Sequence, residues 1–362
     1  MTKNTLYGSE MSYFSGKARA YLHWRGIAFD EIAPTPNVMK SEIIANVGWP
    51  VIPVLRTPEG EYVQDTADII AYFEAKSSGP KAIPETPLQR MVTFLLQLFA
   101  DEWMTLPAMH YRWNHNEEWI FGEFGKNAAP DGTPEEQYEA GKAVGQRFRS
   151  FVPMLGITPE TIPGVEKAYE QFLADLSAHL DAVPYLLGTR ASYADFAMIG
   201  PLYAHQYRDK FTGEHMKRTA PKVADYVERV IAGEGKTGEL VPQDDLPATL
   251  LPILKVALGE HLPVLAKTNE LFSEWARTAE PKSEVPRGMG MVPFTTGGHS
   301  GMIAARTFSL LRLQDALDAY LMMLPSDKKR ADSFLDAVGG SAFKTLRINP
   351  RLTRRNYKLA LA

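Results

Sequence analysis

Three short segments near the start of the chain carry residue types and spacings that would hold a small anionic peptide. They are residues 12–16 (Ser-Tyr-Phe-Ser-Gly), 51–53 (Val-Ile-Pro) and 64–67 (Gln-Asp-Thr-Ala). The first and third place hydroxyls or a carboxylate where a helix begins, and the unpaired N–H groups and dipole of a helix N-terminus attract negative charge. The second is a strand opened by a proline. Segments of these kinds that converge would form a binding site.

An alternating strand-and-helix pattern must position these segments. The predicted strands share short runs of alternating or β-branched apolar residues, and they are 5–7, 28–32, 54–57 and 61–63. Helical spacing predicts helices at 16–24 and 65–73, the first of which ends at Gly26. Together they predict an α/β domain at residues 1–78, followed by a short linker.

The rest of the chain has mainly helical spacing. Residues 192–195 (Ser-Tyr-Ala-Asp) resemble a capping box with Asp in the last position, and they open an apolar core helix at 196–203 that Pro201 would kink or end. We place an all-helical domain at 88–232 and a mainly helical C-terminal extension at 247–362. Residues 280–301 of the extension are rich in Gly and Pro. The predicted helices of the extension are 250–265, 269–278, 306–324 and 327–338.

The composition narrows the function classes. The chain has 362 residues, 45% of them hydrophobic and 23% charged, and a net charge of −4, which argues against a general nucleic-acid binder. Without an apolar run long enough to span a bilayer and without a signal peptide, we expect a cytoplasmic protein that does not bind membranes. The chain contains no cysteine. Any thiol chemistry must therefore use a thiol that the ligand brings.

The proline-led strand, the hydroxyl-rich turn and the segment 185–195 occur in an order that resembles the cytosolic glutathione transferases over about residues 4–230. The resemblance implies a thioredoxin-like N-terminal domain, an all-α transferase domain and glutathione as co-substrate. Residues 12–19 look like the serine-type catalytic turn of the zeta- and theta-like branches. The segments 99–103 and 109–113, with the long tail, look like an elongated bacterial subgroup of the family.

Ser12 stands at the position that the resemblance assigns to catalysis. A hydroxyl that donates a hydrogen bond at a helix N-terminus would favour the thiolate of glutathione through the bond and through the helix dipole. Tyr13 and Ser15 are the alternatives for contact with glutathione, whereas Tyr7 reads as structural. The other interpretation is that Ser12 only caps its helix, since serine is preferred there in any case.

The resemblance also implies roles for two further pairs of residues. Ile52 and Pro53 match the cis-proline segment, in which the Ile52 backbone pairs with the cysteinyl backbone of glutathione. Thr66 would bind the γ-glutamyl carboxylate at the helix N-terminus, and Asp65 would pair with the α-amino group. A plain helix cap is the alternative for Asp65 and Thr66.

One departure from the family pattern concerns the glycyl carboxylate of glutathione. Many relatives carry a lysine shortly before the cis-proline, but residues 49–52 (Trp-Pro-Val-Ile) contain no cation. Lys40, Arg56 or an arginine of the basic tail (344–362) would have to replace it. Otherwise glutathione binds weakly or another ligand takes its place.

A second-substrate pocket is expected in the helical region, although the same aromatic residues could simply form a core. Its candidate lining residues are Trp103, Met104, Met109, His110 and Trp113. We expect no metal site, because the spacing of His110 and His115 with nearby carboxylates fits no standard motif. The glycine-rich residues 297–301 lack the features of a phosphate loop and predict a flexible turn.

These observations leave three functional interpretations open. The first is a glutathione transferase, a homodimer that attacks a small apolar electrophile with the thiolate of glutathione. The second is a non-catalytic binding or scaffold protein, which the missing lysine and the extension favour. The third is a glutathione-dependent isomerase or thioether lyase that uses the same site. Fold alone does not decide among them.

Overall fold

A computed structural model describes residues 3–362 and divides them into two compact units. Unit 1 comprises the residues up to Ala82 with Pro107–Val152 and Asp195–Thr237, and unit 2 comprises Ile83–Leu106, Pro153–Ala194 and Gly238–Ala362. Each unit is thus assembled from separate stretches of the chain. The three consecutive domains expected from the sequence follow a different division and stay a prediction.

A four-stranded mixed sheet lies in unit 1 and has the order β2-β1-β3-β4. Its strands are β1 (Asn4–Tyr7), β2 (Phe29–Ile32), β3 (Val54–Arg56) and β4 (Tyr62–Gln64). β1 and β2 are parallel because helix α1 (Tyr13–Arg25) crosses between them, whereas β3 pairs antiparallel with both β1 and β4. This is the thioredoxin-like arrangement expected from the sequence.

The helices that flank the sheet agree with the sequence in place but differ at their ends. α1 begins at Tyr13, three residues before the predicted start, because Ser12 caps it, and Gly26 ends it in the left-handed conformation with a φ of 71°. α4 runs over Thr66–Lys76. Between β2 and β3 lie three short helical segments: α2 (Pro36–Val38), η1 (Met39–Ile44) and α3 (Ala45–Val47).

Further helices complete unit 1. They are α6 (Thr105–His115, which begins at the boundary between the units), α7 (Glu117–Ala128), α8 (Pro134–Arg149), α10 (Tyr193–Pro201), η4 (Leu202–Tyr207), α11 (Lys210–Thr219) and α12 (Pro221–Ile231). The predicted apolar helix corresponds to α10, whose residues are buried. It ends at Pro201, as expected, and the chain continues as the π-helical turn η4.

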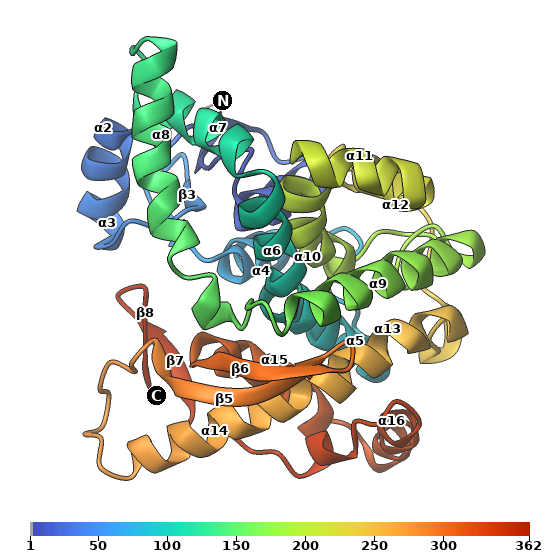
Figure 1. The fold of residues 1–362 in the computed structure, drawn as a ribbon. Coiled ribbons are helices and arrows are strands. Elements are labelled where there is room, and N and C mark those ends of the chain that lie inside the picture. Colours follow the sequence, from blue (N-terminus) through green and yellow to red (C-terminus); the bar gives the residue numbers. More distant parts are fainter. Residues whose placement is uncertain (1–2) are drawn as a thin grey trace. The chain divides into compact units, whose positions relative to one another are not determined.

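Unit 2 is built mainly from helices, with two β-hairpins. Its helices are α5 (Pro87–Leu98), η2 (Phe99–Trp103), η3 (Pro153–Leu155), α9 (Ile162–Ala182), η5 (Pro242–Asp244), η6 (Ala248–Leu250), α13 (Leu251–Val256), η7 (Ala257–His261), α14 (Leu262–Ala276), α15 (Phe308–Leu321), α16 (Pro325–Ala337) and η8 (Ser341–Lys344). Its strands are β5 (Gly288–Thr296), β6 (His299–Arg306), β7 (Leu352–Arg355) and β8 (Lys358–Leu361). β5 lies along α14 (Figure 1).

The two hairpins add strands to the extension, which the sequence predicts to be mainly helical. In β5 the side chains of Val292, Phe294 and Thr296 are buried and alternate with exposed neighbours, which is the pattern of a half-buried strand. Gly297 and Gly298, both with positive φ, form the two-residue turn into β6. Such a turn needs this conformation twice, and glycine adopts it without strain. The predicted flexible turn is therefore a hairpin turn.

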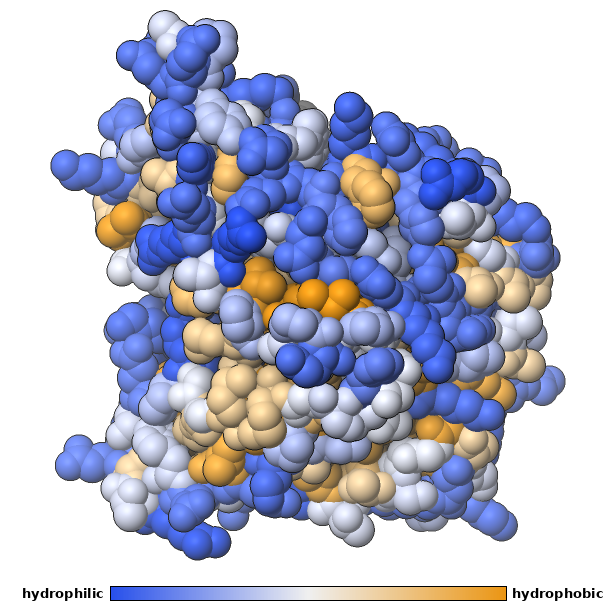
Figure 2. Space-filling view, viewed as in Figure 1, coloured by the Kyte–Doolittle hydropathy of each residue, from blue (hydrophilic) through white to orange (hydrophobic). Residues whose placement is uncertain are grey.

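One long helical stretch of unit 2, Ala248–Ala276, is apolar enough to cross a membrane by length and composition alone. Half of its apolar window is buried inside the protein, and a core helix passes the same test. Figure 2 shows hydrophilic side chains over most of the face drawn, with apolar side chains in smaller groups. Among residues 3–362, the large apolar side chains with the greatest exposure are those of Met322 (84%) and Leu324 (68%).

Close contact between α7 and α8 depends on glycines. A Cβ atom at Gly141 would lie 1.9 Å from the carbonyl oxygen of Phe121, and one at Gly125 would lie 2.0 Å from the carbonyl oxygen of Gln137. These obstacles are backbone atoms, which cannot move aside without separating the helices. The two glycines therefore set how closely the helices approach.

We expect Gly141→Ala to destabilise the protein by about 1–3 kcal/mol because it overpacks this contact. The measurement is the free energy of unfolding in urea. Gly122→Ala is the matched control, since a Cβ at Gly122 on α7 meets no atom within 4 Å. Alanine there should leave stability unchanged or raise it slightly. Equal stability of the two variants would contradict the close contact.

Candidate functional site

The register of the sheet brings the three candidate segments to one edge of unit 1. Tyr7, the last residue of β1, pairs with Val54, the first residue of β3, and Val54 pairs in turn with Gln64, the last residue of β4. The segments that leave or enter the sheet at this edge are residues 8–12, 51–53 and 65–66. Segments separated by about fifty residues are therefore neighbours at one sheet edge.

Ser12 lies at the N-cap of α1 and is half-buried. Its Oγ accepts a hydrogen bond from the N–H of Ser15 (3.2 Å), and its own N–H donates to the carbonyl of Ser9 (3.0 Å). Ser15 is fully buried, and its Oγ accepts from the N–H of Ser9 (3.3 Å). The ring of Tyr13 is buried against His205. Of these three candidates, Ser12 is the one whose residue retains substantial exposure.

The segment before β3 has the geometry that the sequence predicts. The Ile52–Pro53 peptide bond is cis. Within residues 3–362, neither the backbone N–H nor the C=O of Ile52 has a hydrogen-bond partner. Both groups therefore remain available to an extended peptide.

The start of α4 combines a cap with an unusual backbone conformation. Asp65 is the N-cap, and its Oδ1 accepts from the N–H of Ala67 (2.9 Å). Its φ of 82° and ψ of 138° are rare for a residue with a side chain and cost of order 1–3 kcal/mol. Thr66, the first residue of the helix, is 3% exposed. Such strain persists only where the surrounding structure enforces it, and it occurs frequently at ligand sites.

Glu42, on η1, gathers three donors close to the end of β1. Its Oε2 accepts from the hydroxyls of Tyr7 (2.6 Å) and Tyr62 (2.9 Å) and from the guanidinium of Arg56 (3.3 Å). The two tyrosine hydrogen bonds lower the pKa of Glu42, while burial and the bond to Glu42 raise the pKa of Tyr7. Tyr7 thus has the structural role expected of it, and Arg56 is already paired. Lys40 is exposed on the same segment.

A buried ion pair that sequence reasoning missed lies behind the turn of Ser12. Arg112 on α6 binds both carboxylate oxygens of Asp209, with Nε–Oδ2 at 2.7 Å and Nη2–Oδ1 at 2.8 Å, and the side chains are 4% and 0% exposed. Nη1 of Arg112 also donates to the carbonyl of Met11 (2.8 Å). Arg112 and Asp209 are 97 positions apart, and no motif links them. The local sequence signal for this ion pair was limited to Asp209, an aspartate that directly precedes helix α11.

The residues predicted to line a second-substrate pocket are divided between the units. Trp103 and Met104 belong to unit 2, whereas Met109, His110 and Trp113 belong to unit 1. All are buried except Met109, which is half-buried. The rings of Phe121 and Phe124 pack near Trp113. The pocket therefore stays a prediction.

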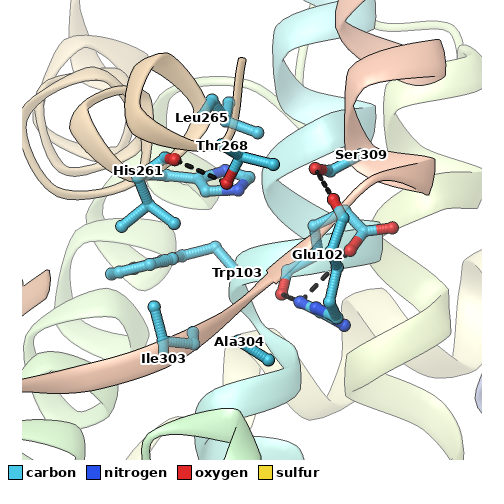
Figure 3. Close-up of a pocket in the computed structure, with 10 residues that line it drawn as sticks. Glu102, Trp103, His261, Leu265, Thr268, Ile303, Ala304 and Ser309 are labelled. Atoms are coloured by element: carbon cyan, nitrogen blue, oxygen red, sulfur yellow. Dashed lines mark hydrogen bonds and ion pairs between the residues drawn. The ribbon is translucent and has the colours of Figure 1, made fainter. Parts of the chain in front are cut away.

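Trp103 lines a small cavity within unit 2 that also includes Glu102, His261 and Arg306 (Figure 3). The cavity measures about 10 Å³, roughly the space of one water molecule. The rings of Trp103 and His261 stack with centroids 5.1 Å apart, and Arg306 forms an ion pair with Glu102 at 3.1 Å. Glu102 and Trp103 belong to η2 and His261 to η7, both π-helical turns, which often occur at functional sites.

Burial governs the protonation of His261. The residue is 4% exposed, and desolvation, together with the charge of Arg306, lowers its pKa to about 3. His261 is therefore neutral near neutral pH. A neutral imidazole repels a cation less than a protonated one would. The cavity is, however, too small for an organic ligand.

The chain matches the two family profiles of glutathione S-transferases. Residues 6–81 match the glutathione S-transferase N-terminal domain, and residues 158–234 match the C-terminal domain. A probable glutathione S-transferase of Zea mays, BZ2, is 31% identical over 113 residues, which cover 28% of this chain and 48% of that protein. The chain thus spans about half the length of this curated relative. Residues 6–81 and 158–234 are thus similar to the two domains of glutathione S-transferases.

The solved structures to which the chain is similar cover about two thirds of it. The β-etherase LigF from Sphingobium sp. strain SYK-6 is 20% identical, with a TM-score of 0.47, and covers 65% of this chain and 98% of its own. A glutathione S-transferase from Rhodospirillum rubrum F11 is 17% identical, with a TM-score of 0.41, and covers 68% and 97%. Residues 235–362 lie beyond both family domains.

The low pKa of His261 predicts a pH dependence of stability. In the unfolded chain a histidine binds a proton below about pH 6.5, whereas folded His261 stays neutral down to about pH 3. The unfolding free energy should therefore fall as the pH drops below 6.5, with a slope of up to about 1.4 kcal/mol per pH unit from this residue. His261→Phe keeps an aromatic ring on Trp103 and should reduce that slope.

The measurement is denaturant unfolding of the wild type and of His261→Phe between pH 5 and 7. Thr268→Val, at another wall of the cavity, is the control because it changes no titratable group. Its slope should equal that of the wild type. An unchanged slope in His261→Phe would show that His261 takes up its proton in the folded state.

Proposed function

We propose that the protein is a glutathione transferase in which Ser12 stabilises the thiolate of bound glutathione. The observation that carries this proposal is the register at Tyr7, Val54 and Gln64, which gathers two helix N-termini and the unpaired Ile52 backbone at one edge of the sheet. The family domains over 6–81 and 158–234 support the same function.

The proposed binding mode uses backbone and side-chain groups at that edge. The Ile52 N–H and C=O would pair with the cysteinyl backbone of glutathione. The hydroxyl and N–H of Thr66, at the N-terminus of α4, would bind the γ-glutamyl carboxylate, which the helix dipole also favours. The Asp65 carboxylate would accept from the α-amino group while it caps the helix.

The hydrogen bonding of Ser12 supports its proposed role. Because its Oγ accepts from the N–H of Ser15, its own proton remains available for donation to a sulfur. A free thiol has a pKa of about 8.5, so a donor at a helix N-terminus would increase the thiolate fraction at neutral pH. The thiol proton passes to solvent. The thiolate then forms a C–S bond to the electrophile, and a leaving group departs with its electron pair.

The proposal extends to the second substrate and to the assembly. We expect an apolar electrophile, given the aromatic and methionine residues at 103–113, and a cytoplasmic homodimer. The competing interpretations are a binding protein without catalysis and a glutathione-dependent isomerase or lyase. Glutathione binding without turnover of any electrophile would favour the binding protein. Turnover without a net glutathione conjugate would favour the isomerase or lyase.

Removal of the Thr66 hydroxyl should weaken glutathione binding. We expect Thr66→Ala to raise the dissociation constant about tenfold, which is a loss of about 1.4 kcal/mol, as measured by calorimetry. Thr66→Ser retains the hydroxyl and should bind like the wild type. No binding by the wild type up to several millimolar would overturn the proposed function.

Removal of the Ser12 hydroxyl should raise the pKa of the bound thiol. We expect Ser12→Ala to shift this pKa upward by about one unit, as measured from the ultraviolet absorbance of the thiolate. Thr133→Ala is the matched control, because Thr133 caps α8 through the N–H of Glu136 in the same way (3.3 Å). It should lose similar stability, about 1 kcal/mol, without any effect on the thiol. If the thiol of glutathione bound to Ser12→Ala has the same pKa as in the wild type, Ser12 acts only as a helix cap.

A further inference from the structure

We propose that Arg112 is the positioning residue of the site and that it orients Ser12 through the backbone carbonyl of Met11. The inference rests on the proposed function, because it concerns the hydroxyl that would meet the thiolate. Arg112 itself lies in the second layer behind the turn. It is 3% exposed and reaches Met11 from α6, a helix outside the sheet-forming segment.

The peptide plane before Ser12 is held at both ends. The Met11 C=O accepts from Nη1 of Arg112 at 2.8 Å, and the Ser12 N–H at the other end of the same plane donates to Ser9 at 3.0 Å. Because a peptide unit is planar, two such bonds fix its orientation. The Ser12 side chain is then held by its bond from Ser15. The direction of the hydroxyl therefore depends on Arg112.

Arg112 can act as a rigid support because its other donors are bound as well. Nε and Nη2 meet the two oxygens of Asp209, and Nη2 also donates to the carbonyl of Ala204 at 2.8 Å. A planar guanidinium with three fixed partners has no rotational freedom left. A lysine could pair with Asp209 but has a single ammonium group and cannot reproduce the fork.

Two local irregularities supply the partners of Arg112. Asp209 occupies the N-cap of α11 but makes no side-chain cap hydrogen bond, since both of its oxygens bind Arg112. Ala204 lies in the π-helical turn η4 that follows Pro201. α11, which lacks a side-chain cap, and η4, which departs from α-helical hydrogen bonding, thus both direct a polar group to the guanidinium of Arg112. Neither departure benefits its own helix.

The test replaces Arg112 by lysine and follows the thiol pKa separately from glutathione binding. We expect Arg112→Lys to bind glutathione within about twofold of the wild type, because the proposed contacts of Ile52 and Thr66 are untouched. The thiol pKa should rise by about one unit, which means about tenfold less thiolate at neutral pH. With an electrophile, kcat/KM at neutral pH should fall by about the same factor and recover at high pH.

The matched control is Arg330→Lys, which alters an exposed ion pair with Asp245 in unit 2 (2.8 Å). It should leave both binding and thiol pKa unchanged. If Arg112→Lys does not fold, the double variant Arg112→Met with Asp209→Leu removes both buried charges together, which cores tolerate better than an unpaired charge. It should show the same rise in thiol pKa.

The outcomes separate this inference from the proposed function. Normal binding with a raised thiol pKa supports both. Normal binding with a wild-type thiol pKa, in either folded variant, overturns the role of Arg112 and leaves the transferase proposal standing. No glutathione binding by the wild type overturns both. A wild-type protein that binds glutathione without lowering its thiol pKa overturns the roles of Ser12 and Arg112 together.

Discussion

The pairing of β3 between β1 and β4 is the constraint on which the candidate site depends. It aligns Tyr7, Val54 and Gln64, so that three chain segments leave the sheet at one edge. The side chains of a strand alternate between faces, and a slip of one residue would exchange the faces on which Val54 and Leu55, both buried, are packed. Packing on both faces of β3 therefore favours this register, and the register sets the geometry of the candidate site.

Packing of the surrounding structure compensates for two locally unfavourable features near the candidate site. Asp65 holds a backbone conformation that is rare outside glycine, and Asp209 forgoes the cap of its own helix. Breaking a buried pair such as Arg112 with Asp209 usually costs about 3–5 kcal/mol, yet replacement of both partners by apolar residues can be neutral. The pair is therefore poorly explained by stability alone. Its hydrogen bond to Met11 supplies a reason for a charged pair at this position.

Local signals in the sequence predict the sheet, α1, α4 and α10, because capping residues, Gly26 and Pro201 act within a few positions of themselves. The hairpin of β5 and β6 escaped prediction because its glycines and Pro293 obscure the alternation, although Gly297-Gly298 is a recognised hairpin turn. Ser12, Ile52 and Thr66 could be proposed from motifs. Arg112 could not, since its partners, Met11 and residues 204–209, lie about a hundred positions away on either side and only tertiary packing brings them together.

The absence of cysteine gives the arrangement at the sheet edge its chemical meaning. A thioredoxin-like domain without a thiol cannot exchange disulfides through its own side chains, so the sulfur has to belong to the ligand. In the proposed function, the protein's contribution is to hold that sulfur and favour its ionised form. A half-buried hydroxyl whose oxygen already accepts one hydrogen bond is suited to donate another. If Ser12 has this role, the direction of its hydroxyl matters, and the backbone before Ser12 then matters as well.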